Sequence, residues 1–137
     1  MVAKILELGD LAPEMIPVRI NRLDEITSAT TTVTLMAYKF GPRCPVVKKV
    51  ELAQIRQRYI KISEEELGLQ NSISATYLGA YVRDVILAMI QGLTFEEADL
   101  IAADDEKTVS IMEYLGIWRP SEDETESDDQ GEVKTDQ

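Results

Sequence analysis

A run of apolar and small residues at positions 76–90 constrains the fold of this chain more than any other feature of its sequence. Only Arg83 and Asp84 interrupt the run. Apolar side chains recur there at spacings of three and four, the period of an α-helix, and form two adjacent stripes. The stripes are Ile73, Tyr77, Tyr81 and Val85, and Leu78, Val82, Ile86 and Met89. We therefore predict a central helix that is apolar over most of its circumference and must be covered by its own domain or by a second copy.

The rest of the chain has the size of one folded domain. Its 137 residues are enough to bury a core. No apolar run reaches the length of a transmembrane helix, and the N-terminus lacks the basic region and apolar block of a signal peptide. We therefore expect a cytoplasmic protein (in the host cytoplasm if the source is viral) that does not bind membranes.

Three segments of the N-terminal half have the composition of β-strands. Residues 2–8 alternate loosely and are followed by a Gly-Asp pair, and residues 18–24 alternate Val and Ile with Arg. Residues 30–40 are rich in β-branched Thr and Val, which suit a pleated surface. One face of that strand would carry Thr31, Val33, Leu35 and Ala37. A helix over residues 24–40 is the competing interpretation, because periodicity alone does not exclude it.

The middle of the chain begins with a loop rich in Gly and Pro at residues 41–45. Residues 46–52 favour a strand that then continues into a helix ending near Ile62. Ser63 and Glu66 have the spacing of a capping box, in which each side chain satisfies a backbone N–H of the other residue. We therefore predict that a new helix starts at Ser63.

Further capping signals divide the C-terminal half into helices. Asn71 or Ser72 is positioned to cap the central helix, and Gly92 to end it. Thr94 and Glu97 form a second capping box at the start of a short helix. These signals place a tight turn directly after the central helix.

The last predicted helix begins at Asp104 or Asp105 and ends at Gly116. Its predicted inward-facing residues are Val109, Met112 and Leu115. Trp118 follows the helix, and we expect its ring to pack back onto the core.

These elements together predict an α+β domain over residues 1–120. Short N-terminal β-strands precede a helical C-terminal half that contains the central apolar helix. Residues 121–137 hold eight acidic residues, one Val and no aromatic residue. Because so few apolar groups cannot offset the entropy of ordering, we predict that this segment is a disordered acidic tail.

The net charge of −11 is distributed unevenly. Residues 1–93 hold eleven basic and ten acidic residues, whereas residues 94–137 hold three basic and fifteen acidic ones. Residues 39–61 alone carry seven basic residues and one acid. Such a charge dipole suits head-to-tail association of copies or docking on a basic partner, and it is equally compatible with an ordinary solvated surface.

The residue inventory disfavours catalysis and metal binding. The chain has no His, a single cysteine (Cys44), no glycine-rich phosphate-binding motif and no HExxH motif. Helix capping explains its adjacent acidic pairs, and no segment has the ligand spacing of a calcium-binding loop. We therefore predict a non-enzymatic interaction protein with no catalytic residue, no cofactor and no metal site.

Residues 83–116 resemble sigma-factor region 4 and related helix-turn-helix regulators. The matching segments are Gly92-Leu93-Thr94, Glu96-Glu97-Ala98 and Lys107-Thr108-Val109. The resemblance implies DNA binding by the last helix. The electrostatics depart from it, because residues 94–118 contain seven acids and one Lys, which oppose contact with phosphates. We therefore expect no nucleic-acid binding and retain the regulator as an alternative.

The same third of the chain is similar to the C-terminal half of the tail assembly chaperones of long-tailed bacteriophages. In that family an apolar helix ends in a Gly-Leu turn, a short helix follows, and an Asp opens a last amphipathic helix. The corresponding residues here are 87–90, Gly92-Leu93, Ile101-Ala102-Ala103, Asp105, Val109, Met112 and Leu115. The resemblance implies a protein that self-associates and coats an apolar tape-measure chain until tail-tube subunits replace it.

A helix that is apolar on several faces can bury one side in its domain and offer another to a partner. The residues that we expect to contact a partner protein or a second copy are Tyr77, Tyr81, Val85, Met89, Met112 and Trp118. A third interpretation is an acidic inhibitor that mimics DNA, which the charge and small size fit. Salt distinguishes the two, since binding to a basic target weakens as salt rises and apolar binding persists.

Overall fold

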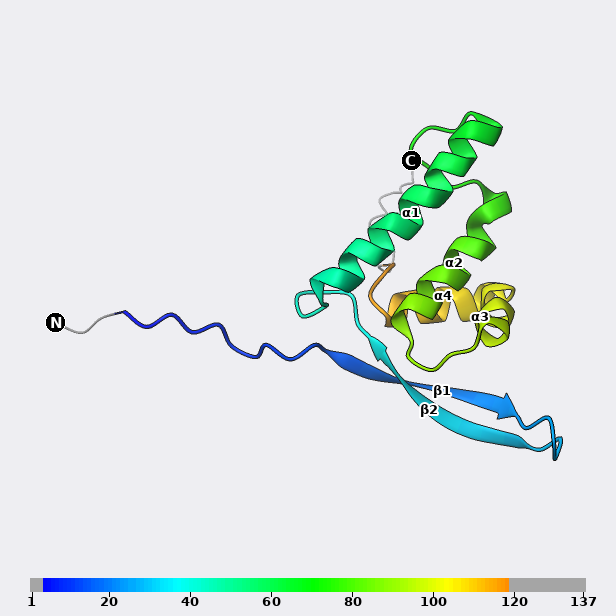
Figure 1. Cartoon of the computed structure of the whole chain (residues 1–137), viewed down its shortest axis with the longest axis horizontal. Helices are drawn as coiled ribbons and strands as arrows, with labels where there is room; N and C mark the ends of the chain where they lie inside the picture. Colours follow the sequence, from blue (N-terminus) through cyan, green and yellow to red (C-terminus); the bar gives the residue numbers. More distant parts are fainter. Residues whose placement is uncertain (1–3, 119–137) are drawn as a thin grey trace, which may run out of the picture.

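The computed structural model describes residues 4–118 (Figure 1). Two antiparallel strands precede four helices, as the predicted α+β class requires. The elements are β1 (Met15–Leu23), β2 (Thr30–Tyr38), α1 (Val46–Leu67), α2 (Ala75–Met89), α3 (Phe95–Ala102) and α4 (Asp105–Tyr114). The predicted acidic tail at residues 121–137 and the predicted domain end at residue 120 lie outside the described residues.

The strands form a two-stranded hairpin, so the helical alternative for residues 24–40 is wrong. Val18 pairs with Leu35 and Ile20 with Val33 in its antiparallel register. Leu35 and Ala37 are buried, whereas the intervening Thr and Met residues are exposed. The predicted alternation of faces in β2 is therefore confirmed, and the inner face of the hairpin packs against the helices.

The predicted strand at residues 2–8 is wrong for the part that the structure describes. Residues 4–14 contain no strand and lead away from the domain (Figure 1). Their large apolar side chains, Ile5, Leu6, Leu8 and Leu11, are 69–81 % exposed. A strand needs a neighbouring strand to satisfy its backbone, and within residues 4–118 of a single copy this segment has none beside it.

A single helix, α1, replaces both the strand predicted at residues 46–52 and the helix start predicted at Ser63. Leu52, Ile55 and Tyr59 recur at helical spacing and are buried, so the packing of this face overrides the β-propensity of the preceding valines. Ser63 lies inside the helix and is fully buried. The helix ends at Gly68, which adopts the left-handed conformation common at helix C-termini.

Ser63 fails as a cap because its hydroxyl joins two helices. The hydroxyl donates a hydrogen bond of 2.8 Å to the carbonyl of Tyr59, one turn earlier, as Ser does within helices. It also accepts a hydrogen bond of 2.9 Å from the backbone N–H of Ser74. Ser74, rather than the predicted Asn71 or Ser72, is the N-cap of α2. The start of the central helix is thus positioned by a tertiary contact.

The C-terminal half of α2 is the centre of the core. Val82, Val85, Ile86 and Met89 are at most 1 % exposed. The chain then runs beside β2, where Ile90 pairs with Ala37 and the Gln91 N–H donates to the Met36 carbonyl at 2.9 Å. The outer edge of β2 is therefore paired at Met36 and Ala37, and Gly92, with φ of 87°, makes the turn into α3.

The predicted capping signals of α3 and α4 are confirmed. Thr94 and Glu97 form a reciprocal capping box, and Asp104 caps α4. Of the residues predicted to face inward, Met112 and Leu115 are buried, but Val109 is 46 % exposed, so its prediction is wrong.

The end of α4 lies against the segment that follows β2. The Phe40 N–H donates to the Leu115 carbonyl at 2.7 Å. Gly116, with φ of 81°, leaves no room for a Cβ, which would lie 2.7 Å from the Phe40 oxygen. Trp118 is half-buried against the core, as predicted.

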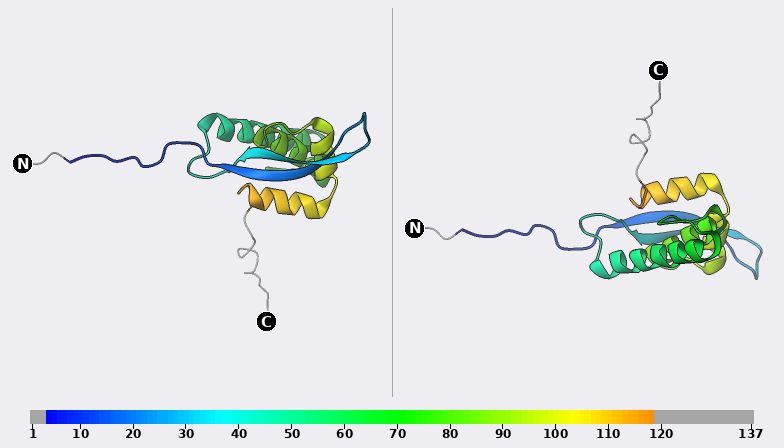
Figure 2. Two further views of the ribbon diagram at one scale, coloured as in Figure 1. Left: turned by 90° about the horizontal axis from the view of Figure 1, so that it is seen from below. Right: turned by 90° about the horizontal axis from the view of Figure 1, so that it is seen from above.

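Figure 2 shows α1 and α4 on either side of the hairpin. Within residues 4–118 no helix is both long and apolar enough to cross a membrane.

We predict that Ser63→Ala destabilises the protein. The substitution leaves the Ser74 N–H without its buried acceptor, which costs about 1–3 kcal/mol. Urea unfolding followed by circular dichroism measures the change. Ser72→Ala, at an exposed position two residues before the cap, is the control and should leave the unfolding free energy almost unchanged. Equal effects of both substitutions would contradict the assignment.

Candidate protein-binding site

The six residues predicted to contact a partner do not form one surface. Val85, Met89 and Met112 are at most 1 % exposed. Because α1, α3 and the hairpin cover α2, and because Met112 faces inward from α4, a partner cannot reach these three side chains in this fold. Their prediction as partner contacts is wrong. Tyr77, Tyr81 and Trp118 are half-buried.

The two tyrosines of this set join α2 to α1. The ring of Tyr59 on α1 lies 6.3 Å, centroid to centroid, from the rings of Tyr77 and Tyr81. Tyr77 hydrogen-bonds the carboxylate of Glu66, and the Tyr59 hydroxyl donates to Asp84 at 2.6 Å. Burial and the Asp84 carboxylate raise the pKa of Tyr59, and burial raises that of Tyr81. These contacts account for the tyrosines as packing between helices of one chain.

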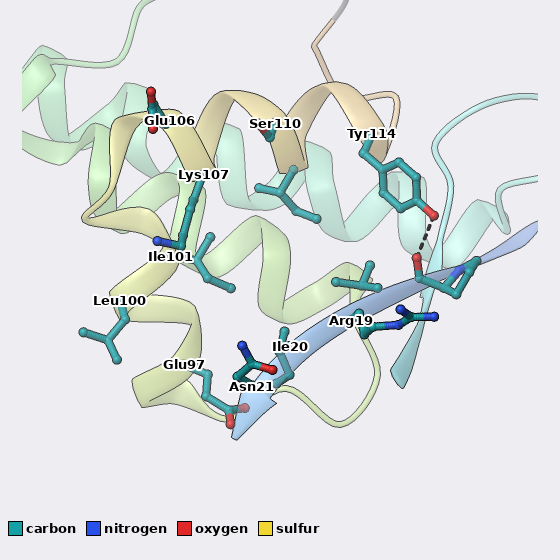
Figure 3. Close-up of a pocket in the computed structure, with 13 residues that line it drawn as sticks. Arg19, Ile20, Asn21, Glu97, Leu100, Ile101, Glu106, Lys107, Ser110 and Tyr114 are labelled. Atoms are coloured by element: carbon teal, nitrogen blue, oxygen red, sulfur yellow. Dashed lines mark hydrogen bonds between the residues drawn. The ribbon is translucent and has the colours of Figure 1, made fainter. Parts of the chain in front are cut away.

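An apolar groove lies on another part of the molecule, between β1 and the helices α3 and α4 (Figure 3). Its volume is about 1120 Å³. The apolar lining residues are Pro17, Val18, Ile20, Leu100, Ile101, Ile111 and Tyr114. Arg19, Asn21, Glu106 and Lys107 line it with polar side chains. Leu100 is 71 % exposed, so the groove presents apolar surface to solvent. We call this feature the β1–α4 groove.

The outer edge of β1 forms one wall of the β1–α4 groove. The Glu14 carbonyl accepts from the Lys39 N–H, so even-numbered residues of β1 direct their backbone groups toward β2. The Pro17 carbonyl points the other way and accepts a hydrogen bond of 2.6 Å from the Tyr114 hydroxyl on α4. Because these directions alternate along a strand, Arg19 and Asn21 direct their backbone N–H and C=O groups into the groove. Pro17 interrupts no pairing with β2, because its nitrogen faces this edge.

An ion pair between β1 and α3 closes one end of the β1–α4 groove. The Arg22 guanidinium donates to both carboxylate oxygens of Glu97, at 2.7 and 2.8 Å, and to the Gly92 carbonyl at 2.9 Å. The hydrogen bonds from Arg22, helped by that from the Thr94 N–H, lower the pKa of Glu97 to about 2 against the opposing effect of burial. The same carboxylate therefore caps α3 and holds the hairpin to it.

The described residues offer little for chemistry at this groove or elsewhere. Within residues 4–118 no cluster of three or more His, Cys, Asp or Glu side chains could hold a metal ion. Cys44 is 5 % exposed, and burial raises the pKa of its thiol, which disfavours the reactive thiolate. The arrangement in the groove, an apolar floor beside an exposed strand edge, is suited to binding a polypeptide.

Sequence reasoning missed the residues of the β1–α4 groove. The alternation of Val18 and Ile20 with Arg19 correctly predicted a strand there, and the structure shows both apolar side chains partly buried. Nothing local in the sequence reveals that Leu100 and Ile111 lie opposite that strand, since the contact spans about eighty residues of chain. The best available signal was Leu100 itself, a Leu on the face of α3 opposite the buried Ala98.

Comparison with known proteins returns no match to a family model, a curated protein or a solved structure.

We predict that Glu97→Gln lowers the free energy of unfolding at neutral pH. We also predict that the free energy of unfolding of the variant falls less steeply as the pH is lowered. The folded pKa of Glu97 is about 2 and its ordinary value is 4.5, so the unfolded chain binds more protons between these values. The stabilisation is complete above pH 4.5 and is lost as pH falls toward 2. Gln keeps the cap and loses the ion pair, which costs about 1 kcal/mol for a partly exposed pair.

Urea unfolding at neutral pH and at several acidic pH values tests this prediction. The difference in unfolding free energy between wild type and Glu97→Gln should shrink as pH falls. Glu96→Gln removes the same charge from the same turn, where Glu96 makes no ion pair with any residue of the described chain. A constant difference across the pH range would show that Glu97 does not act through its charge.

Proposed function

We propose that this chain is a non-enzymatic assembly protein that binds an extended, apolar segment of a partner protein in the β1–α4 groove. The observation that carries the proposal is the outer edge of β1, which lies open beside apolar side chains of α3 and α4. An extended chain placed there becomes a third strand of the sheet. Its backbone pairs with Arg19 and Asn21, and alternate side chains face the helices.

The lining of the groove supports a preference for apolar side chains on one face of the bound segment. Ile20, Ile101 and Ile111 form the floor, and Leu100 stands at the rim. The carboxylate of Glu97 at the closed end is already paired with Arg22. Because the floor is apolar, the free energy of binding comes mainly from backbone hydrogen bonds and apolar burial, and it depends weakly on salt.

More specifically, we propose that the chain is a cytoplasmic protein with a function similar to that of the tail assembly chaperones. The resemblance of residues 87–115 to that family supplies it, and a groove for an extended apolar segment is compatible with holding an apolar chain before assembly. Such a role requires reversible binding. Strand addition is reversible because it uses backbone hydrogen bonds and apolar contacts and forms no covalent bond. Self-association is a second property that the resemblance implies.

The helix-turn-helix alternative stays a prediction that the charges of α4 disfavour. The helix is capped by Asp104 and carries Asp105 and Glu106 in its first turn. Lys107 lies 3.1 Å from the Asp104 carboxylate, which offsets its charge. A phosphate backbone approaching this end would meet net negative charge. The DNA-mimic alternative requires a basic target rather than an apolar groove, and the salt dependence of binding separates the two.

We predict that the protein binds a short fluorescent peptide of alternating Leu and Thr, with Lys at both ends for solubility. Fluorescence polarisation at low and high salt measures the affinity. A peptide N-methylated at alternate residues, on the edge that faces β1, should bind at least about tenfold more weakly, because it lacks the donors that pair with the strand. Equal affinity for the two peptides would exclude strand addition.

A matched pair of substitutions locates the site. Leu100→Asp places a charge at the rim of the groove, at a position 71 % exposed, and should abolish peptide binding without unfolding the domain. Val109→Asp introduces the same charge on α4, at a position 46 % exposed outside the groove lining, and should bind like wild type. Circular dichroism confirms folding. Loss of binding in both variants, or in neither, would place the site elsewhere.

A further inference from the structure

We propose that the N-terminal arm of one copy, residues 4–13, occupies the β1–α4 groove of a second copy. The inference rests on the proposed function, because it names a partner for the same groove. It starts from two incomplete features of the described part of one copy. One is an apolar segment without a neighbouring strand, and the other is the outer edge of β1, which pairs with no other strand there. The two features complement each other.

The arm has the composition of a strand but no place to form one in its own copy. Ile5, Leu6, Leu8 and Leu11 are 69–81 % exposed. So many large apolar side chains in one short exposed segment indicate a surface that becomes covered. Leu6 and Leu8 are two positions apart in the sequence, so they lie on the same face of an extended chain.

The arm is directed away from its own groove. Asp10 accepts a hydrogen bond of 2.6 Å from Arg43, in the loop after β2. From this anchor, residues 4–9 continue away from the domain (Figures 1 and 2). To reach the outer edge of its own β1, the arm would have to reverse between Gly9 and Met15 and give up the contact with Arg43. The arm can bind the groove of a second copy without reversing its direction and without losing the contact between Asp10 and Arg43.

The arm fits the groove in length, pattern and charge. The five residues 4–8 match in length the five residues of β1 that line the groove, 17–21, because extended chains rise equally, about 3.3 Å per residue. With Leu6 and Leu8 turned toward Ile20 and Ile111, the intervening Glu7 lies on the outer face of the sheet. Odd-numbered residues of β1 expose their side chains on that face, so Glu7 comes beside Arg19.

Exchange of arms covers Leu6 and Leu8 and extends the sheet with a third strand. It also makes the arm a competitor for any partner segment that uses the same groove. A partner must displace the arm of the second copy, so each groove stays covered until a partner binds, and binding releases the second copy's arm.

Sedimentation velocity on the full chain tests the proposal. Wild type should self-associate. The arm variant Leu6→Asp/Leu8→Asp and the groove variant Leu100→Asp should each associate at least about tenfold more weakly, because a charge would enter an apolar contact. Ile26→Asp, at a position 93 % exposed in the turn between the strands, is the control and should associate like wild type.

Mixing the two variants gives the decisive result. The arm variant keeps an intact groove and the groove variant keeps an intact arm, so the mixture should form a pair through the one remaining contact. Monomeric wild type, association that survives the arm substitutions, or a mixture that stays monomeric would overturn the inference.

The Leu–Thr peptide distinguishes failure of this inference from failure of the proposed function. If wild type is monomeric and its groove binds the peptide, the arm is not the occupant and the proposed function stands. If neither association nor peptide binding occurs, both fail. If the arm occupies the groove, the arm variant should bind the peptide more tightly than wild type, since its groove is free.

Discussion

Burial of the C-terminal half of α2 is the constraint on which the rest of the structure depends. Val82, Val85, Ile86 and Met89 are removed from water almost completely, and no single neighbouring element could cover them all. The helix α1 covers one side, α3 another, and the inner face of the hairpin a third. The segment after α2 then pairs with β2, so the same helix that forms the core also fixes where the hairpin lies.

The β1–α4 groove follows from that placement. The segment after α2 pairs with the outer edge of β2 at Met36 and Ala37, whereas the outer edge of β1 faces α3 and α4 across the groove. Tyr114 ties α4 along this edge through the Pro17 carbonyl, and Arg22 ties the strand to Glu97 on α3. The helices thus lie beside the edge and restrict access to it. Exposed strand edges invite unselective pairing, and helices that lie beside the edge limit this hazard.

The fold could be predicted from the sequence wherever a residue interacts mainly within its own helix or strand. Thr94 and Glu97 cap the first turn of the helix in which Glu97 lies. In β2, the alternation of apolar and polar side chains indicates which face is buried. Prediction failed where a residue with a strong local signal serves a distant contact. Ser63 and Glu66 have the spacing of a cap, yet the Ser63 hydroxyl lies inside α1 because it accepts from Ser74.

The sequence by itself determined that this is an α+β chain with a largely apolar helix to bury. Only the tertiary structure decided which apolar residues stay accessible. Met89 and Leu100 have similar apolar character in the sequence, yet the first is fully buried and the second is 71 % exposed. Their difference depends on which distant elements cover each helix face, and side-chain spacing within one helix carries no information about those elements.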